Sequence, residues 1–140
     1  MWHRFFIFLF AAFCIVQSAY AGTITRSYKW NYNGKLYSTS ISVDEDTYKY
    51  YKGVRRDYYD FTVYTRENFK YPVVKQVATA LKNIAEKNNL TEWQTIEFVT
   101  AFVQHLRYVN DGKYEYPRYP AETLVEMGGD CEDTAILLTS

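Results

Sequence analysis

The stretch of sequence that decides the fold is Tyr116-Pro-Arg-Tyr-Pro-Ala-Glu-Thr-Leu-Val-Glu-Met-Gly-Gly-Asp-Cys-Glu-Asp-Thr-Ala-Ile-Leu-Leu138. Pro120 suits the first turn of a helix, so a short helix is predicted over residues 121–127. The Gly-Gly pair that follows ends this helix. Asp130 is then placed to cap a new helix that begins at Cys131. The stretch therefore predicts a cysteine in the first turn of a helix.

A cysteine in this position is suited to nucleophilic chemistry. The N-terminal end of a helix carries partial positive charge and free backbone N–H groups, which favour a thiolate over a thiol. The same N–H groups can donate to the oxyanion that forms when sulfur attacks a carbonyl. Cys131 is the only cysteine in residues 22–140. From the residues alone, a buried inert cysteine or one paired between chains stays an open alternative.

The quoted stretch resembles the active-cysteine segment of the transglutaminase-like superfamily of bacteria and archaea. Residues Phe102-Val-Gln-His-Leu-Arg-Tyr108 are similar to the helix and the strand that precede this segment in the same group. The resemblance implies a papain-like α+β fold, in which a sheet later in the chain supplies a histidine and then an aspartate. We therefore expect these two partners beyond Ser140, and the chain to be a truncated N-terminal part of a secreted cysteine peptidase that is inactive by itself.

The activity that the resemblance implies is hydrolysis of a peptide or carboxamide bond in a protein or peptide substrate at the cell surface. Cys131 would attack the carbonyl and form a thioester, which water or an amine then resolves. Hydrolysis is favoured over crosslinking because water is abundant outside the cell. This chemistry requires no cofactor. The competing hypothesis is a non-catalytic cell-surface module of the same fold that binds peptide or glycan through aromatic side chains.

Acidic residues flank the predicted nucleophile. Asp130, Glu132 and Asp133 place negative charge beside a group that must itself become an anion, and like charge disfavours the thiolate. One interpretation is that these acids cap the helix and complement its dipole. The alternative is a bound hard cation such as Ca²⁺, which prefers several oxygen ligands. Periplasmic transglutaminase-like proteinases that cleave surface adhesins are similar in this Asp-Cys-Glu-Asp motif, and that resemblance implies that the acids hold calcium.

Two features near the motif have more than one interpretation. His105 is the only histidine in residues 22–140, and we interpret it as structural or partly exposed. If it were the base, Asp130 or Asp133 would be its orienting acid, because triads are set by geometry rather than by chain order. Tyr116, Arg118 and Tyr119 precede the cysteine closely, so they either line its cleft or anchor the loop.

Residues 1–21 have the layout of a signal peptide. Arg4 precedes an apolar run over residues 5–16, which is shorter than the roughly 20 residues that a membrane-spanning helix needs. Small residues stand at positions 19 and 21, so we predict cleavage after Ala21 and a secreted, periplasmic or cell-surface protein without a membrane span. Cleavage leaves one more acidic than basic residue, which argues against nucleic acid as a partner.

The rest of the sequence predicts a β-rich extension over residues 22–66 and the start of the transglutaminase-like domain over residues 67–140. Asn33-Gly34 separates two β-rich runs and is typical of a hairpin turn. The aromatic side chains of this hairpin either cover one face of a sheet or form a sugar-stacking surface. The other expected elements are helices at residues 44–51, 74–87 and 92–108, and an extended segment at residues 58–64.

Overall fold

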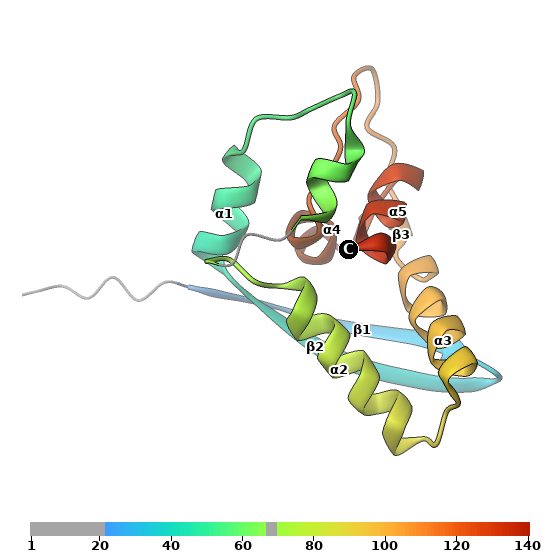
Figure 1. Cartoon of the computed structure of the whole chain (residues 1–140). Helices are drawn as coiled ribbons and strands as arrows, with labels where there is room; N and C mark the ends of the chain where they lie inside the picture. The colour runs from blue at the N-terminus through green and yellow to red at the C-terminus, as the bar shows by residue number, and fades with distance from the viewer. Residues whose placement is uncertain (1–21, 67–69) are drawn as a thin grey trace, which may run out of the picture.

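A computed structural model describes residues 22–66 and 70–140 and shows a mixed α+β chain (Figure 1). A long hairpin packs against helix α3 (Glu92–Gln104), and other helices lie above it in this view. The α+β class predicted from the sequence is confirmed. The predicted signal peptide, residues 1–21, lies outside the described residues.

The N-terminal hairpin consists of strands β1 (Thr23–Tyr32) and β2 (Lys35–Asp44), paired antiparallel from one end to the other. Asn33 and Gly34 form the turn with φ of 49° and 74°, as a tight turn between twisted strands requires. The predicted hairpin and its turn are confirmed.

One face of the hairpin is aromatic and packs against helix α3 (Glu92–Gln104). Trp30 is 0% exposed, and its ring centroid lies 5.2 Å from those of both Phe98 and Phe102. Tyr37 of the neighbouring strand is buried against Phe98. The hairpin aromatics therefore cover one face of the sheet, as the first interpretation predicts, and they are not available to stack on a sugar.

Helix α2 (Val74–Lys87) and helix α3 pack beside each other. Thr91 and Gln94 form the predicted capping box at the start of α3. The helix ends at Gln104, however, and not near Tyr108 as the apolar pattern suggests. Residues 107–108 instead form strand β3 (Arg107–Tyr108), which pairs in parallel with β4 (Gly128–Gly129). This long-range pairing competes with the helical pattern and stops the helix.

The segment after helix α1 (Glu45–Gly53) is a second correction. An extended conformation was predicted for residues 58–64, but the chain forms the 3-10 helix η1 (Phe61–Thr65). The Asp60 side chain accepts a hydrogen bond from the backbone of Thr62 and so caps this turn. Tyr64 is buried, and its hydroxyl bonds the backbone of Asp57. Local capping and one anchored tyrosine thus outweigh the alternating pattern.

The two helices predicted in the quoted stretch are confirmed as α4 (Pro120–Glu126) and α5 (Cys131–Thr139), and the glycine pair between them forms strand β4, which was not predicted. The hairpin contacts this part directly, since Arg26 donates to the carbonyl of Val125 at 2.7 Å and the Tyr28 hydroxyl donates to that of Leu124. One hydrophobic core therefore joins the N-terminal extension to the cysteine helix. Within residues 22–66 and 70–140, no helix combines the length and the apolar character needed to cross a membrane.

Candidate active site

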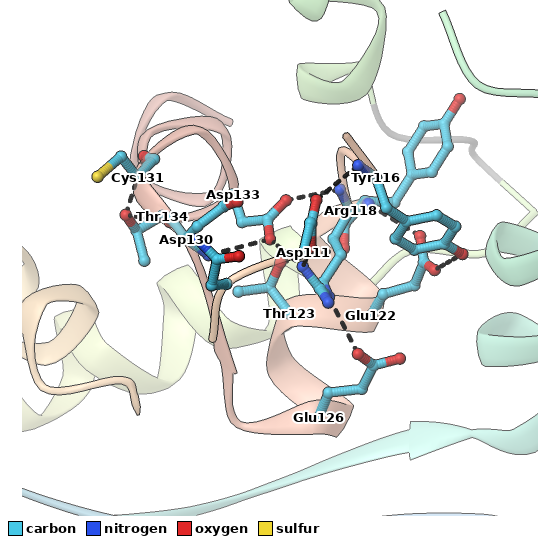
Figure 2. Close-up of polar contacts among 12 residues, drawn as sticks. Asp111, Tyr116, Arg118, Glu122, Thr123, Glu126, Asp130, Cys131, Asp133 and Thr134 are labelled. Atoms are coloured by element: carbon cyan, nitrogen blue, oxygen red, sulfur yellow. Dashed lines mark hydrogen bonds and ion pairs between the residues drawn. The ribbon is translucent and has the colours of Figure 1, made fainter. Parts of the chain in front are cut away.

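Cys131 is the first residue of α5, and its side chain is exposed. Figure 2 shows the sulfur directed away from the buried polar network that surrounds Asp133. Asp130 is the N-cap of the helix, and its backbone carbonyl accepts a hydrogen bond from Thr134. The thiol is therefore accessible at the end of the helix where backbone N–H groups have no partner within the helix.

The two glycines before Cys131 are needed for close packing. A Cβ atom on Gly129 would lie 2.5 Å from the Cβ atom of Asp133, and one on Gly128 would meet the carbonyl oxygen of Arg107. Pairing between β3 and β4 brings these backbones together. The sequence predicted a helix break here. The structure adds that Arg107 packs closely against Gly128 and Asp133 packs closely against Gly129, which leaves no room for a side chain at either position.

Asp133 holds the first turn of α5 from inside the molecule. Its side chain is 0% exposed, and its Oδ1 atom accepts from the backbone N–H of Arg118 at 2.6 Å. Its Oδ2 atom accepts from Nη1 of Arg118 at 2.5 Å and from the backbone N–H of Asp130 at 3.2 Å. Of the three acids predicted to be either caps or cation ligands, Asp133 is therefore engaged as a cap and an ion-pair partner.

Asp130 and Glu132 lie in a cluster with two acids that the sequence did not indicate, Asp111 and Glu115. One carboxylate oxygen from each of the four lies within 4.8 Å of the others. The register of β3 and β4 explains the arrangement, since parallel pairing at Tyr108 and Gly129 places the residues that follow each strand side by side. The sequence alone did not indicate this cluster, because the loop after β3 and the start of α5 share no motif and only the strand pairing brings them together.

Oxygens of this acidic cluster lack partners. Oδ1 of Asp130 and Oε1 of Glu132 are buried and make no hydrogen bond within the described part of the chain. Asp130 is only 8% exposed. Burial raises the pKa of both carboxyls, and their proximity to each other raises that of Asp130 further. Negative charge on these carboxylates is therefore unfavourable, and a bound proton or cation would reduce the repulsion between them.

A second buried carboxylate lies next to the site. Glu122 of α4 is 0% exposed, and Arg56 donates to both of its oxygens at 2.8 and 2.9 Å. The Tyr116 hydroxyl and the Tyr119 backbone N–H bond the same carboxylate. Burial raises the pKa of Glu122 even though these partners oppose the shift. The tyrosines before the cysteine thus anchor the loop, the second of the two interpretations.

His105 is exposed at the end of α3, in a hollow that Tyr28, Trp30 and Met127 also line. The residues around this hollow do not include Cys131 or Asp133. The structure therefore does not bring His105 together with the nucleophile as the alternative triad would require.

These carboxyls predict how stability depends on pH. Burial raises the pKa of Asp130, Glu132, Asp133 and Glu122, so the folded chain binds more protons than the unfolded chain above about pH 4. Stability is then lost as the pH rises through the raised values. In excess chelator, we expect the melting temperature to fall by on the order of 5 °C from about pH 5 to about pH 8.

Glu126 works in the opposite direction but in a different range. Burial opposes its ionisation, yet hydrogen bonds from Lys52, Arg118 and Tyr48 outweigh burial and lower its pKa. The contribution of Glu126 to stability is fully present above its ordinary pKa and is lost only as the pH falls through its lowered pKa. The predicted fall in melting temperature between about pH 5 and about pH 8 is measured by thermal unfolding followed by circular dichroism. A melting temperature that is constant or rises over this range would contradict the prediction.

Compared with models of protein families, with curated proteins and with solved structures, the chain matches none.

Proposed function

We propose that this chain carries the nucleophile of a secreted transglutaminase-like cysteine hydrolase with a papain-like core. The observation that carries the proposal is the exposed thiol of Cys131 at the start of α5, a helix whose first turn is fixed by a buried ion pair. A rigid helix start supports nucleophilic chemistry because the thiolate and the developing oxyanion both gain from fixed N–H dipoles. The substrate class is a peptide or carboxamide carbonyl.

In the proposed reaction the Cys131 thiolate attacks the carbonyl carbon and forms a tetrahedral intermediate. Backbone N–H groups of the first turn of α5 donate to its oxyanion. The C–N bond then breaks, the amine takes a proton and leaves, and a thioester remains on the sulfur. Water hydrolyses the thioester, which releases the acid and restores the thiol. In this proposal a histidine oriented by an aspartate serves as base and acid. His105, the only histidine in residues 22–140, does not fill that role because it lies in a hollow that Cys131 does not line.

The proposal is tested on the full-length protein with amide substrates. Turnover is followed as ammonia released from glutamine-containing peptides and as new amino termini from proteins, which separates carboxamide from peptide hydrolysis. One equivalent of iodoacetamide on Cys131 should stop both, and saturating substrate should slow the alkylation. Turnover that continues after complete alkylation of Cys131 would rule the mechanism out.

We also propose that the acidic cluster binds Ca²⁺. Asp111, Glu115, Asp130 and Glu132 offer only oxygen ligands, as a hard cation prefers, and two of these oxygens are buried without another partner. A divalent cation there would offset the negative charge of the carboxylates on either side of Cys131.

The calcium proposal predicts that chelation slows alkylation of Cys131. With excess chelator, we expect the rate with iodoacetamide at neutral pH to fall about tenfold, because the carboxylates next to the sulfur then have no cation to offset their charge. Glu115→Gln should lose the calcium response. Glu86→Gln, which changes an exposed acid on α2 that is paired with Lys82, should keep it. A rate that is the same with calcium and with chelator would refute calcium binding at this cluster.

The binding module remains a second candidate because of one observation. Arg55, Tyr58, Tyr59 and Val63 line an open hollow, and Tyr59 is 100% exposed. Exposed aromatic side chains next to a guanidinium suit the binding of peptide or glycan. Binding of wall polymers or peptides that survives Cys131→Ala, in a protein without turnover, would favour this candidate over the enzyme.

A further inference from the structure

Arg118 is the residue that connects the acidic surroundings of the site to the cysteine helix. It is buried, and its guanidinium donates to Asp111 at 2.6 Å, to Asp133 at 2.5 Å and to Glu126 at 3.0 Å. These carboxylates belong to the loop after β3, to α5 and to the end of α4. Figure 2 shows the guanidinium between them. One planar side chain thus ties three separate segments together.

The contact with Asp133 is the one that reaches the cysteine. Asp133 accepts from both the backbone and the side chain of Arg118, and the same carboxylate accepts from the backbone N–H of Asp130. Asp130 directly precedes Cys131 and caps its helix. The position of the first turn of α5 is therefore fixed through Asp133, and Asp133 is fixed by Arg118.

The charges make this arrangement sensitive to the loss of the arginine. Burial raises the pKa of Asp133, and Arg118 is the cation that opposes this shift. Burial also opposes the charge on Arg118, but its carboxylate partners outweigh burial and raise its pKa. Without the guanidinium, Asp133 would be a buried carboxyl without a cation, and its bonds to the start of the helix would weaken.

We propose that Arg118 is a positioning residue, which holds the first turn of α5 through Asp133 and so sets the reactivity of the Cys131 thiol. It does not touch the reacting atoms itself. The inference rests on the proposed function only in taking Cys131 as the reactive group. It predicts that the arginine matters for thiol chemistry beyond its contribution to stability.

The test compares Arg118→Met with Glu126→Gln in the full-length protein at fixed calcium concentration. Glu126 also accepts hydrogen bonds from the Arg118 guanidinium, as well as from Lys52 and Tyr48. Glu126→Gln weakens these bonds but leaves the contact between Arg118 and Asp133 in place. For each variant, the rate of Cys131 alkylation by iodoacetamide is measured at one neutral pH, together with the melting temperature. Arg66→Met, the same chemical change at an exposed arginine, is the matched control.

We expect Arg118→Met to slow alkylation about tenfold, because the first turn of α5 and its free N–H groups are then no longer held in one position beside the sulfur. Glu126→Gln should lower the melting temperature without changing the alkylation rate, and Arg66→Met should change neither. An unchanged alkylation rate in Arg118→Met would overturn the inference. So would equal slowing in Arg118→Met and Glu126→Gln, because Arg118 would then act through stability alone.

Should Arg118→Met fail to fold, Arg118→Lys carries the test. Lysine keeps the charge but lacks the planar fork that reaches three carboxylates. We expect an intermediate alkylation rate from this variant, and a wild-type rate would overturn the inference. The readout does not need turnover. A protein without amide turnover but with the predicted alkylation rates would rule out the proposed function and leave the role of Arg118 intact.

Discussion

Replacing Cys131 with serine in the full-length protein should lower amide turnover by more than about a thousandfold while the fold is unchanged. A serine hydroxyl is a far weaker nucleophile than a thiolate when its neighbours are arranged for sulfur. Because the Cys131 side chain is exposed and the core does not include it, the free energy of unfolding should change by no more than about 0.5 kcal/mol. The measurement is the steady-state rate of ammonia or amine release.

Urea denaturation of the same preparation is the control for this variant, since an intact midpoint shows that activity was lost through chemistry. Retained turnover in Cys131→Ser, at more than a tenth of the wild-type rate, would end the hypothesis of a thiol nucleophile. The binding module would then be the better account of the fold.

Arg56→Met should destabilise the protein by about 3–5 kcal/mol, the usual cost of leaving a buried charge without its partner. Arg56 bonds both oxygens of Glu122, which has no exposed surface, and it also lies over the ring of Tyr116. Lys52 lies 3.6 Å from the same carboxylate but bonds Glu126 more closely. The measurement is the free energy of unfolding in urea.

A matched surface pair calibrates this prediction. Lys49 and Glu45 form an exposed ion pair on α1, and Lys49→Met should cost less than about 1 kcal/mol. The double change Arg56→Met with Glu122→Gln should recover much of the loss, because no buried charge is then left alone. If Arg56→Met costs no more than Lys49→Met, the buried pair does not hold the loop to α4.

Local signals in the sequence were enough for the elements around the site. Asn33-Gly34 predicted the hairpin turn, Thr91 with Gln94 predicted the start of α3, and Asp130 predicted the start of the cysteine helix. In each case, the physical cause lies within a few residues of chain. Turns and helix starts that depend on local geometry therefore could be predicted from the sequence.

The error at the end of α3 arose because a distant segment decides where the helix stops. The end of α3 depends on the pairing of Arg107 with Gly128, which no local pattern contains. The same pairing brings Asp111 beside Asp130 and so assembles the acidic cluster. A periodic pattern reports which face is apolar, but it does not report which strand lies opposite.

The burial of charge was likewise hidden in the sequence. Glu122 lies in the helix predicted over residues 121–127, but nothing in the sequence indicates that it has no exposed surface and pairs with the distant Arg56. Arg118 was assigned to the cleft or to the loop, and the structure shows that it bonds three carboxylates at once. Such networks depend on side chains from several elements, so they are found only when the fold is known.

The most direct test of the central claim is the intact mass of the full-length protein after acid quenching during turnover of an amide substrate. A thiol nucleophile predicts a covalent species, heavier by the acyl part of the substrate, with peptide mapping that places the acyl group on Cys131. The adduct should disappear when substrate is exhausted. Turnover with the acyl group on another residue would contradict the account, and so would turnover in which quenching at every time yields only the unmodified mass.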